Sequence, residues 1–318
     1  CSGATATLNG TGFVPFNASQ YGFAANTGAS LDPMTGAATV IASNTSSGGT
    51  GDDTPSGLLS LGFTFYYEGV AYTQYSISPD GFIRLGTAAT SQFTNAVTSS
   101  TNTPKIYPLW DDLATGSNGN AKALVTGTAP NRIFIAQWFL TIPRNLTGSA
   151  NSTFQVWLYE TSNVIEFRYG TVVAPGSGNS GASAGITGVT STNFQSITYS
   201  SNTASNSTAN DGNTTTGPAS GAIYTFTPPS TVSYAWTAPT NLVSPSNQST
   251  ATTALSTTET FTLTVSNGGC STQATATVTV SAGAAITTDP SAAAKCAGET
   301  ATFTVVATGP GLTYLWRK

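Results

Sequence analysis

Apolar and polar residues alternate along many short segments of this chain, which is the pattern of half-buried β-strands. Phe154, Val156 and Leu158 fall on one face of such a strand, while Gln155 and Trp157 fall on the other. Residues 165–169 repeat the alternation, because their three apolar residues alternate with a glutamate and an arginine. No segment carries the three-to-four-residue spacing of an amphipathic helix. The pattern therefore predicts an all-β protein.

Short turn sequences join these strands into antiparallel hairpins. Residues 61–78 predict two strands that turn at Glu68-Gly69, and Pro79-Asp80-Gly81 leads into a further strand at 82–86. Two more hairpins are predicted at 123–142 and 153–170, followed by strands at 183–189 and 222–228 with a long surface loop at 200–220 between them. Repeated hairpins without helical spacers predict a jelly-roll-like β-sandwich over residues 1–228.

The composition of the sequence changes after Pro228-Pro229, where short Thr-rich strands are predicted. A Tyr-x-Trp strand occurs twice, as Tyr234-Ala235-Trp236 and as Tyr314-Leu315-Trp316. A buried Trp on an inner strand is typical of immunoglobulin-like sandwiches. We therefore expect an Ig/PKD-like module at 229–281, incomplete at its start, and the first half of a further Ig-like module at 282–318.

Composition excludes several kinds of function. The chain of 318 residues has no histidine, which excludes Ser-His-Asp and Cys-His catalysis and His-ligated zinc. Its nine Lys and Arg against thirteen Asp and Glu give a net charge of −4, without the basic patch that nucleic-acid binding needs. No apolar run is long enough for a membrane-spanning helix. A surface rich in Ser, Thr, Asn and Gly favours an extracellular or cell-surface protein.

Three cysteines allow no CxxC…CxxC zinc site, and their pairing stays open. Cys1 is a candidate for lipid attachment, for a disulfide or for a free thiol. Cys270 and Cys296 are separated by a strand of the predicted hairpin, so a bridge between them is not favoured. No disulfide is assigned.

Carboxylates are the remaining candidates for chemistry. Asp111 and Asp112 follow Trp110 at the start of a polar loop, and Asp80 and the pair Asp52-Asp53 lie in other loops. Clustered Asp oxygens suit Ca²⁺, which makes a calcium site one hypothesis. The alternative is that Asp111 and Asp112 only bond backbone N–H groups of the loop. Neighbouring residues of a strand point to opposite faces, so a catalytic carboxylate pair is not expected, and no other cofactor is predicted.

Aromatic residues on the strands form a second set of candidates. Exposed aromatic rows stack sugar rings, and Trp138, Trp157 and Tyr159 are the residues we consider for ligand binding. The alternative is that they belong to the core. Nearby, Glu160, Glu166 and Arg168 are expected to form surface ion pairs only.

Four blocks of the chain resemble modular surface and secreted proteins of Bacteroidetes-type bacteria, which the type IX system exports. The blocks are LGFTFYYEGVAYTQYSISPDGFIRLG, YPLWDDL, TGTAPNRIFIAQW and FQVWLYETSNVIEFRYG. Residues 234–280 are similar to the PKD/Ig-like stalk repeats of these proteins, and residues 287–318 to the first half of an Ig-like repeat. The resemblance implies an exported β-protein built of modules.

These observations predict a non-catalytic extracellular surface protein that acts as an adhesin or stalk. Two half-modules leave strand edges open, which either reflects a shortened chain or allows strand exchange between neighbours. The alternative functions are therefore a self-assembling filament subunit and an accessory or carbohydrate-binding module of a larger secreted hydrolase. The expected partners are other copies of the chain in a head-to-tail polymer, or surface glycans and proteins.

Overall fold

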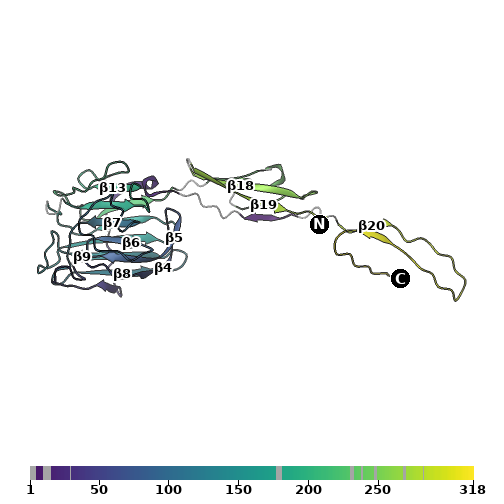
Figure 1. Ribbon diagram of the computed structural model, residues 1–318, viewed down its shortest axis with the longest axis horizontal. Coiled ribbons are helices and arrows are strands. Elements are labelled where there is room, and N and C mark those ends of the chain that lie inside the picture. Colours follow the sequence, from purple (N-terminus) through teal and green to yellow (C-terminus); the bar gives the residue numbers. More distant parts are fainter. Residues whose placement is uncertain are drawn as a thin grey trace. The chain divides into compact units, whose positions relative to one another are not determined.

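A computed structural model describes residues 5–9, 16–28, 30–176, 181–229, 233–237, 239–246, 249–267, 270–281 and 283–318 (Figure 1). Its contacts divide the chain into two units. One is Pro15–Ser230, and the other combines Cys1–Val14 with Thr231–Lys318. The predicted boundary at residue 1 therefore differs from the observed one, because residues before 15 group with the C-terminal part of the chain.

The unit Pro15–Ser230 is a sandwich of two antiparallel sheets with seven strands each, which confirms the all-β fold class (Figure 1). The first sheet has the order β2 (Gly22–Thr27), β15 (Ala222–Thr227), β11 (Ile165–Tyr169), β10 (Ser152–Tyr159), β9 (Ile133–Leu140), β8 (Asn120–Thr126), β3 (Ala38–Ile41). The second has the order β14 (Thr203–Ser205), β13 (Phe194–Thr198), β12 (Ser183–Thr187), β7 (Lys105–Trp110), β6 (Phe82–Leu85), β5 (Val70–Ser78), β4 (Leu59–Tyr67). The second sheet is largely a meander, because all of its neighbouring strands except β12 and β7 are consecutive in the chain, whereas in the first sheet only β8 to β11 form a meander.

The predicted hairpins are present with their turns. β4 and β5 are joined at Glu68 and Gly69, both of which have positive φ, as a two-residue hairpin turn requires. The hairpins β8–β9 and β10–β11 also lie where the alternation indicates. The predicted loop at 200–220 is partly wrong, because it contains the short edge strand β14.

Phe154, Val156 and Leu158 of β10 are fully buried between the two sheets, as their alternation predicts. The same core takes inward residues from both sheets, including Trp138 and Phe167. The outer face of β7 is also buried, because Tyr107 and Trp110 belong to a second, smaller apolar cluster with Phe82, Val97 and Phe194. Residues 87–103, which connect β6 and β7, contribute to this second cluster through Val97.

The described residues of the Ig-like module form five strands. β1 (Thr7–Asn9) pairs with β17 (Ser249–Ala251), and a separate sheet has the order β16 (Ser233–Trp236), β18 (Glu259–Asn267), β19 (Cys270–Val278). Leu8 of β1 is buried with Trp236 and with Phe261, Leu263 and Val265 of β18. Residues 7–9 thus supply a strand that the sequence does not show directly before Trp236. Residues 15–230 are consequently an insertion within this module.

A repeat in the sequence agrees with this arrangement. Residues 1–8, CSGATATL, match residues 296–303, CAGETATF, at five of eight positions. In both places a Tyr-x-Trp segment comes later in the chain, directly in the second copy and after the insertion in the first. The segment that contains β1 is therefore the natural predecessor of the Trp strand.

Beyond the module, β20 (Ala285–Thr288) pairs with β21 (Val306–Thr308) in a two-stranded sheet. Its surroundings leave Phe303 50%, Leu315 78% and Trp316 56% exposed. Among the described residues, no helix has the length and apolar character to cross a membrane.

Candidate functional site

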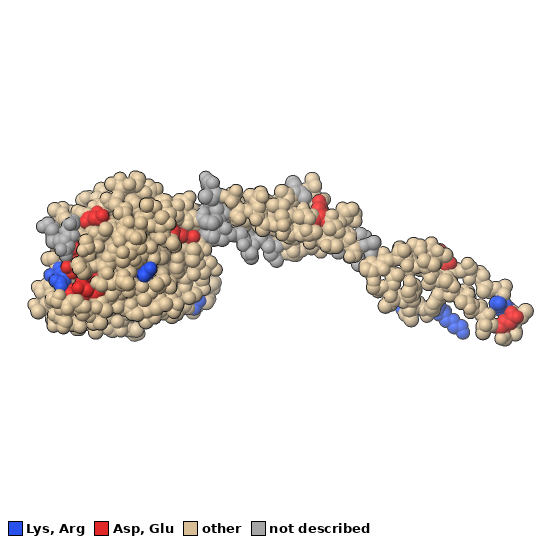
Figure 2. Space-filling view, in the orientation of Figure 1, with Lys and Arg blue, Asp and Glu red and all other residues tan. Residues whose placement is uncertain are grey.

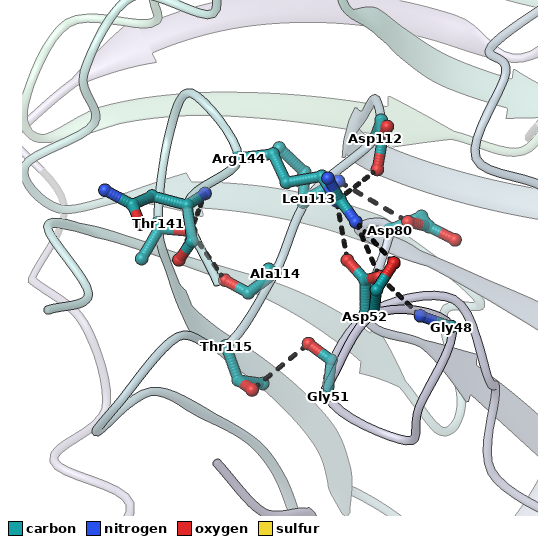
Figure 3. A network of polar contacts seen from close by, with 12 residues as sticks. Gly48, Gly51, Asp52, Asp80, Asp112, Leu113, Ala114, Thr115, Thr141 and Arg144 are labelled. Carbon is teal, nitrogen blue, oxygen red and sulfur yellow. Dashed lines mark hydrogen bonds and ion pairs between the residues drawn. The ribbon is translucent and has the colours of Figure 1, made fainter. Parts of the chain in front are cut away.

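Two loops of the Pro15–Ser230 unit bring acidic residues together, and a third loop adds Arg144 (Figure 3). One oxygen each of Asp52, Asp53 and Asp112 lies within 4.8 Å of the other two. Asp52 and Asp53 belong to a turn after β3, and Asp112 follows the end of β7. The turn is tight because the amides of Asp52 and Asp53 both donate to the carbonyl of Gly49, at 3.0 and 3.1 Å.

Thr115 fastens the turn to the loop that carries Asp112. Its backbone N–H and its hydroxyl both donate to the carbonyl of Gly51, at 2.7 and 3.1 Å, and its Oγ1 accepts the amide of Asn44 at 3.0 Å. A Cβ at Gly51 would lie 2.3 Å from this Oγ1. The close approach of the two loops therefore requires glycine at position 51.

Arg144, in the loop after β9, neutralises part of the cluster (Figure 3). Its Nε and Nη2 donate to the two oxygens of Asp52 at 2.7 Å each, and its Nε lies 3.0 Å from Oδ1 of Asp112. The Asp52 side chain is fully buried, and its Oδ2 also accepts the amide of Gly48 at 2.8 Å. Hydrogen bonding to Asp52 raises the pKa of the Arg144 guanidinium. Arg144 is thus the cation that this site contains by itself.

Asp53 differs from its neighbours. No hydrogen bond or ion pair joins its half-buried carboxylate to another described residue. Burial, followed by repulsion from Asp52 and Asp112, raises its pKa. Three carboxylates against one guanidinium leave an excess of negative charge, so Asp53, Asp52 and Asp112 are the residues that could supply oxygen ligands to Ca²⁺. A calcium ion would compete with Arg144 for two of them.

The other two predicted aspartates, Asp80 and Asp111, are also buried. Asp80 is fully buried, where its Oδ2 accepts the Ser78 hydroxyl at 3.1 Å and its Oδ1 the amide of Leu113 at 3.4 Å. Oδ1 of Asp111 accepts the amide of Asp112 at 2.8 Å. Burial raises the pKa of Asp80 well above its usual range and that of Asp111 to about 7. These bonds fit the predicted alternative, in which aspartates hold backbone N–H groups of the loop.

The sequence therefore brought out all five aspartates around this site, but it centred the candidate calcium site on Asp111 and Asp112, whereas the structure groups Asp112 with Asp52 and Asp53. The residue of this site that the sequence reasoning missed is Arg144. Charged residues make up only 7% of the chain, so each of them could have been considered. In such a chain, an arginine next to a proline in a polar loop is itself a signal. Figure 2 shows how few charged side chains the visible surface carries.

The aromatic candidates do not form one row. Trp138 is fully buried, stacks on Phe154 with ring centroids 5.4 Å apart, and donates its indole N–H to the carbonyl of Ser78 at 2.8 Å. Ligand binding by Trp138 is therefore a wrong prediction, because its side chain points between the sheets with the inward residues of β9.

Trp157 and Tyr159 lie half-buried on the outer face of β10. The guanidinium of Arg168 lies 3.6 Å from the Trp157 ring centroid, and the Tyr159 hydroxyl donates to Glu166 at 2.9 Å. Arg168 also pairs with Glu166 at 2.8 Å, as expected. Because Arg168 already occupies one face of the indole, sugar binding at Trp157 and Tyr159 stays a prediction that these contacts do not favour.

The cysteine predictions stay open. Cys1 and the side chain of Cys270 lie outside the described residues, and Cys296 is an exposed free thiol.

Comparison with known families finds one match. Residues 20–228 match a family model described as NIDO related. The match covers the sandwich, including the acidic loops and Arg144. No curated protein and no solved structure matches the chain.

Proposed function

The chain belongs to the NIDO-related family through residues 20–228, a domain type typical of extracellular proteins, and from this premise we propose that it is a non-catalytic surface protein. It acts outside the cell as an adhesin or stalk that presents the inserted sandwich to a foreign surface. Its partners are glycans or proteins of that surface.

One observation carries this proposal, which is the insertion of residues 15–230 between β1 and β16 of a single Ig-like module. Both ends of a domain inserted in this way connect to the same module, whereas the two ends of an internal domain in a linear array connect to two different modules. Chain termini that lie close together tolerate such insertions. A repeat module that carries an inserted domain supports a role in display.

The acidic loops support a structural role for their residues. Arg144 holds Asp52 and Asp112, while Asp80 and Asp111 accept hydrogen bonds from backbone amides. The carboxylates of Asp80 and Asp111 are thereby fixed to the loop itself. This arrangement suits loops that keep a defined shape for binding.

An adhesion assay with the full chain tests the proposal. Beads coated with residues 1–318 should be retained on surfaces that carry glycans or extracellular proteins, whereas albumin-coated beads should not. The soluble chain, added in excess, should compete for retention. Equal retention of both kinds of bead on every surface would contradict an adhesin role.

A filament subunit is the second candidate, favoured by the exposed apolar residues near β20 and β21. Ile286, Tyr314 and Leu315 are 61%, 57% and 78% exposed, which is unusual for large apolar side chains in water. A neighbouring copy that adds strands at this place would cover them.

Sedimentation velocity at rising protein concentration separates the two candidates. A filament subunit should form larger species as the concentration increases, and Leu315→Ser with Trp316→Ser should suppress them. A chain that stays monomeric up to high concentration would contradict the filament candidate and leave the adhesin proposal intact.

A further inference from the structure

Lys105, the first residue of β7, is fully buried in the second apolar cluster of the sandwich. Its Nζ lies 3.6 Å from the ring centroid of Trp110 and 5.9 Å from those of Phe82 and Tyr107. Residues 87–103 run from β6 to β7 and bring Gln92 against it. A fully buried lysine is rare in proteins unless it is paired.

No carboxylate of the described residues pairs with this lysine. Among the described residues, the ion pairs within 4.0 Å involve Arg132, Arg144 and Arg168 only. Asp211 acts on Lys105 from farther away, and Arg84 opposes it. Burial lowers the pKa of Lys105 to about 7. At neutral pH, Lys105 is therefore an uncharged, nucleophilic amine in a large fraction of the molecules.

The carboxamide of Gln92 faces this amine. Its Oε1 accepts from Lys105 Nζ at 3.3 Å and from Asn102 Nδ2 at 3.1 Å, and its Nε2 donates to Ser99 Oγ at 2.9 Å. The indole N–H of Trp110 donates to the backbone carbonyl of Gln92 at 2.8 Å, which fixes the residue in place. The Asn102 donor polarises the side-chain carbonyl of Gln92, and the Ser99 hydroxyl lies next to the side-chain amide nitrogen of Gln92.

We propose that Lys105 and Gln92 form an intramolecular isopeptide bond. The lone pair of Nζ attacks Cδ of Gln92, and Asn102 stabilises the negative charge on Oε1. The Cδ–Nε2 bond then breaks, the proton lost from Nζ reaches Nε2 through the Ser99 hydroxyl, and ammonia leaves. One amide is exchanged for another, so the step needs no oxidant, reductant or second substrate.

Two physical arguments favour this step. The amine and the carboxamide are held at contact distance by the fold, which removes the entropic cost of bringing two reactants together. The product is a neutral amide, so the cost of burying an unpaired ammonium disappears. Gln92 is partly exposed, which leaves a path for ammonia to escape. The inference does not depend on the adhesin proposal.

Mass spectrometry of the full chain tests the bond. The linked chain should be lighter than its sequence by the mass of ammonia, about 17 Da. Trypsin should cleave after Arg84 and Lys122 but not after Lys105, which gives a peptide of residues 85–122 with the same deficit. Fragmentation should yield no ions between Gln92 and Lys105.

Variants assign the deficit to this pair. Lys105→Met keeps an apolar side chain of similar length in the aromatic cluster, and Gln92→Asn shortens the carboxamide by one carbon, so both should show the full mass. Lys122→Arg, the matched control on β8, should keep the deficit and the tryptic site. In denaturant, an amine-labelling reagent should modify three of the four lysines of the wild-type chain.

A succinimide at Asn118-Gly119 would lose the same mass inside the same peptide, but it would leave Lys105 open to trypsin. Full mass with cleavage after Lys105 would overturn the proposal. A loss of about 18 Da, the mass of water, mapped to Lys105 and Asp211 would overturn the assignment to Gln92.

Discussion

Charged side chains are few in this protein, and those inside the sandwich are held by specific neighbours. Asp52 is held by Arg144, Asp80 by Ser78 and Leu113, and Lys105 by aromatic rings. Because a buried charge without a partner is costly, the ion pair of Asp52 and Arg144 should cost more to break than a surface ion pair. Burial instead shifts the pKa values of Asp80 and Lys105 toward their uncharged forms.

Removal of Arg144 should destabilise the sandwich. Arg144→Met leaves the buried carboxylate of Asp52 without its bidentate partner, and we expect a loss of about 1–3 kcal/mol in the free energy of unfolding, since the arginine itself is partly exposed. Urea denaturation measures this. The double variant with Asp52→Asn should recover most of the loss, and Arg132→Met, which breaks a more exposed pair, should cost less. Equal losses for the two arginine variants would contradict the role of burial.

If the excess negative charge of Asp52, Asp53 and Asp112 forms a cation site, Ca²⁺ should bind to the carboxylate oxygens of these residues. Millimolar Ca²⁺ should then raise the Tm by a few degrees, because a ligand that binds only the folded state stabilises it. Asp53→Asn should abolish the increase, while Asp289→Asn, on an exposed residue, should keep it. An unchanged Tm with Ca²⁺ and with EDTA would remove calcium from consideration.

The titration of Asp111 should make the stability of the sandwich depend on pH. Its folded-state pKa of about 7 lies above the ordinary value of 3.8, so the unfolded state releases this proton first as the pH rises. The contribution of Asp111 to stability should therefore fall between about pH 4 and pH 7 by up to a few kcal/mol and then level off.

Asp111→Asn keeps an oxygen that can accept the amide of Asp112 but has no proton to lose. The variant should be more stable than wild type at pH 8 and similar to it at pH 4, as urea denaturation at both values will show. A variant that is less stable at pH 8 would mean that the ionised carboxylate is needed in the folded loop.

At the scale of elements, hairpins with local turns were predictable and the pairing of β1 was not. Glu68-Gly69 carries its turn geometry in two adjacent residues, whereas β1 pairs with a strand about 240 positions later. The insertion hides this pairing from any local pattern. The repeat of residues 1–8 at 296–303 was the signal that could have revealed it.

Leu8 should be the residue that fastens β1. Its side chain is 7% exposed, and Leu8→Ala should destabilise the Ig-like module by about 2–5 kcal/mol, as for other buried leucines. Val243→Ala, at a 68% exposed site of the same module, is the matched control and should change little. Tryptophan fluorescence and limited proteolysis around residues 233–280 will follow the module. Protection that is the same in both variants would mean that β1 contributes no stability.

For the whole molecule, the two units should unfold in separate transitions, because each has its own apolar core. Phe154→Ala should lower the transition of the Pro15–Ser230 unit by several degrees and leave that of the Ig-like module unchanged, while Leu8→Ala should do the reverse. Differential scanning calorimetry measures both. A single transition that both variants shift would show one cooperative unit.

The class of the whole molecule was predictable, but the composition of its sites was less so. Alternation decides which residues of a strand face inward, and turn residues decide which strands pair locally. Arg144 acts through Asp52 of a loop that is distant in sequence, and Lys105 through Gln92 of the loop that precedes its strand, and no periodicity encodes either contact. Export by the type IX system stays a prediction from resemblance.

The insertion between β1 and β16 also determines how the protein would respond to mechanical tension. A pull applied at residue 1 and at residue 281 enters the Ig-like module at β1 and leaves it after β19. The hydrogen bonds between β1 and β17 and the packing of Leu8 would resist that force first. As long as they hold, the 15–230 sandwich lies outside the line of force and keeps its shape under strain.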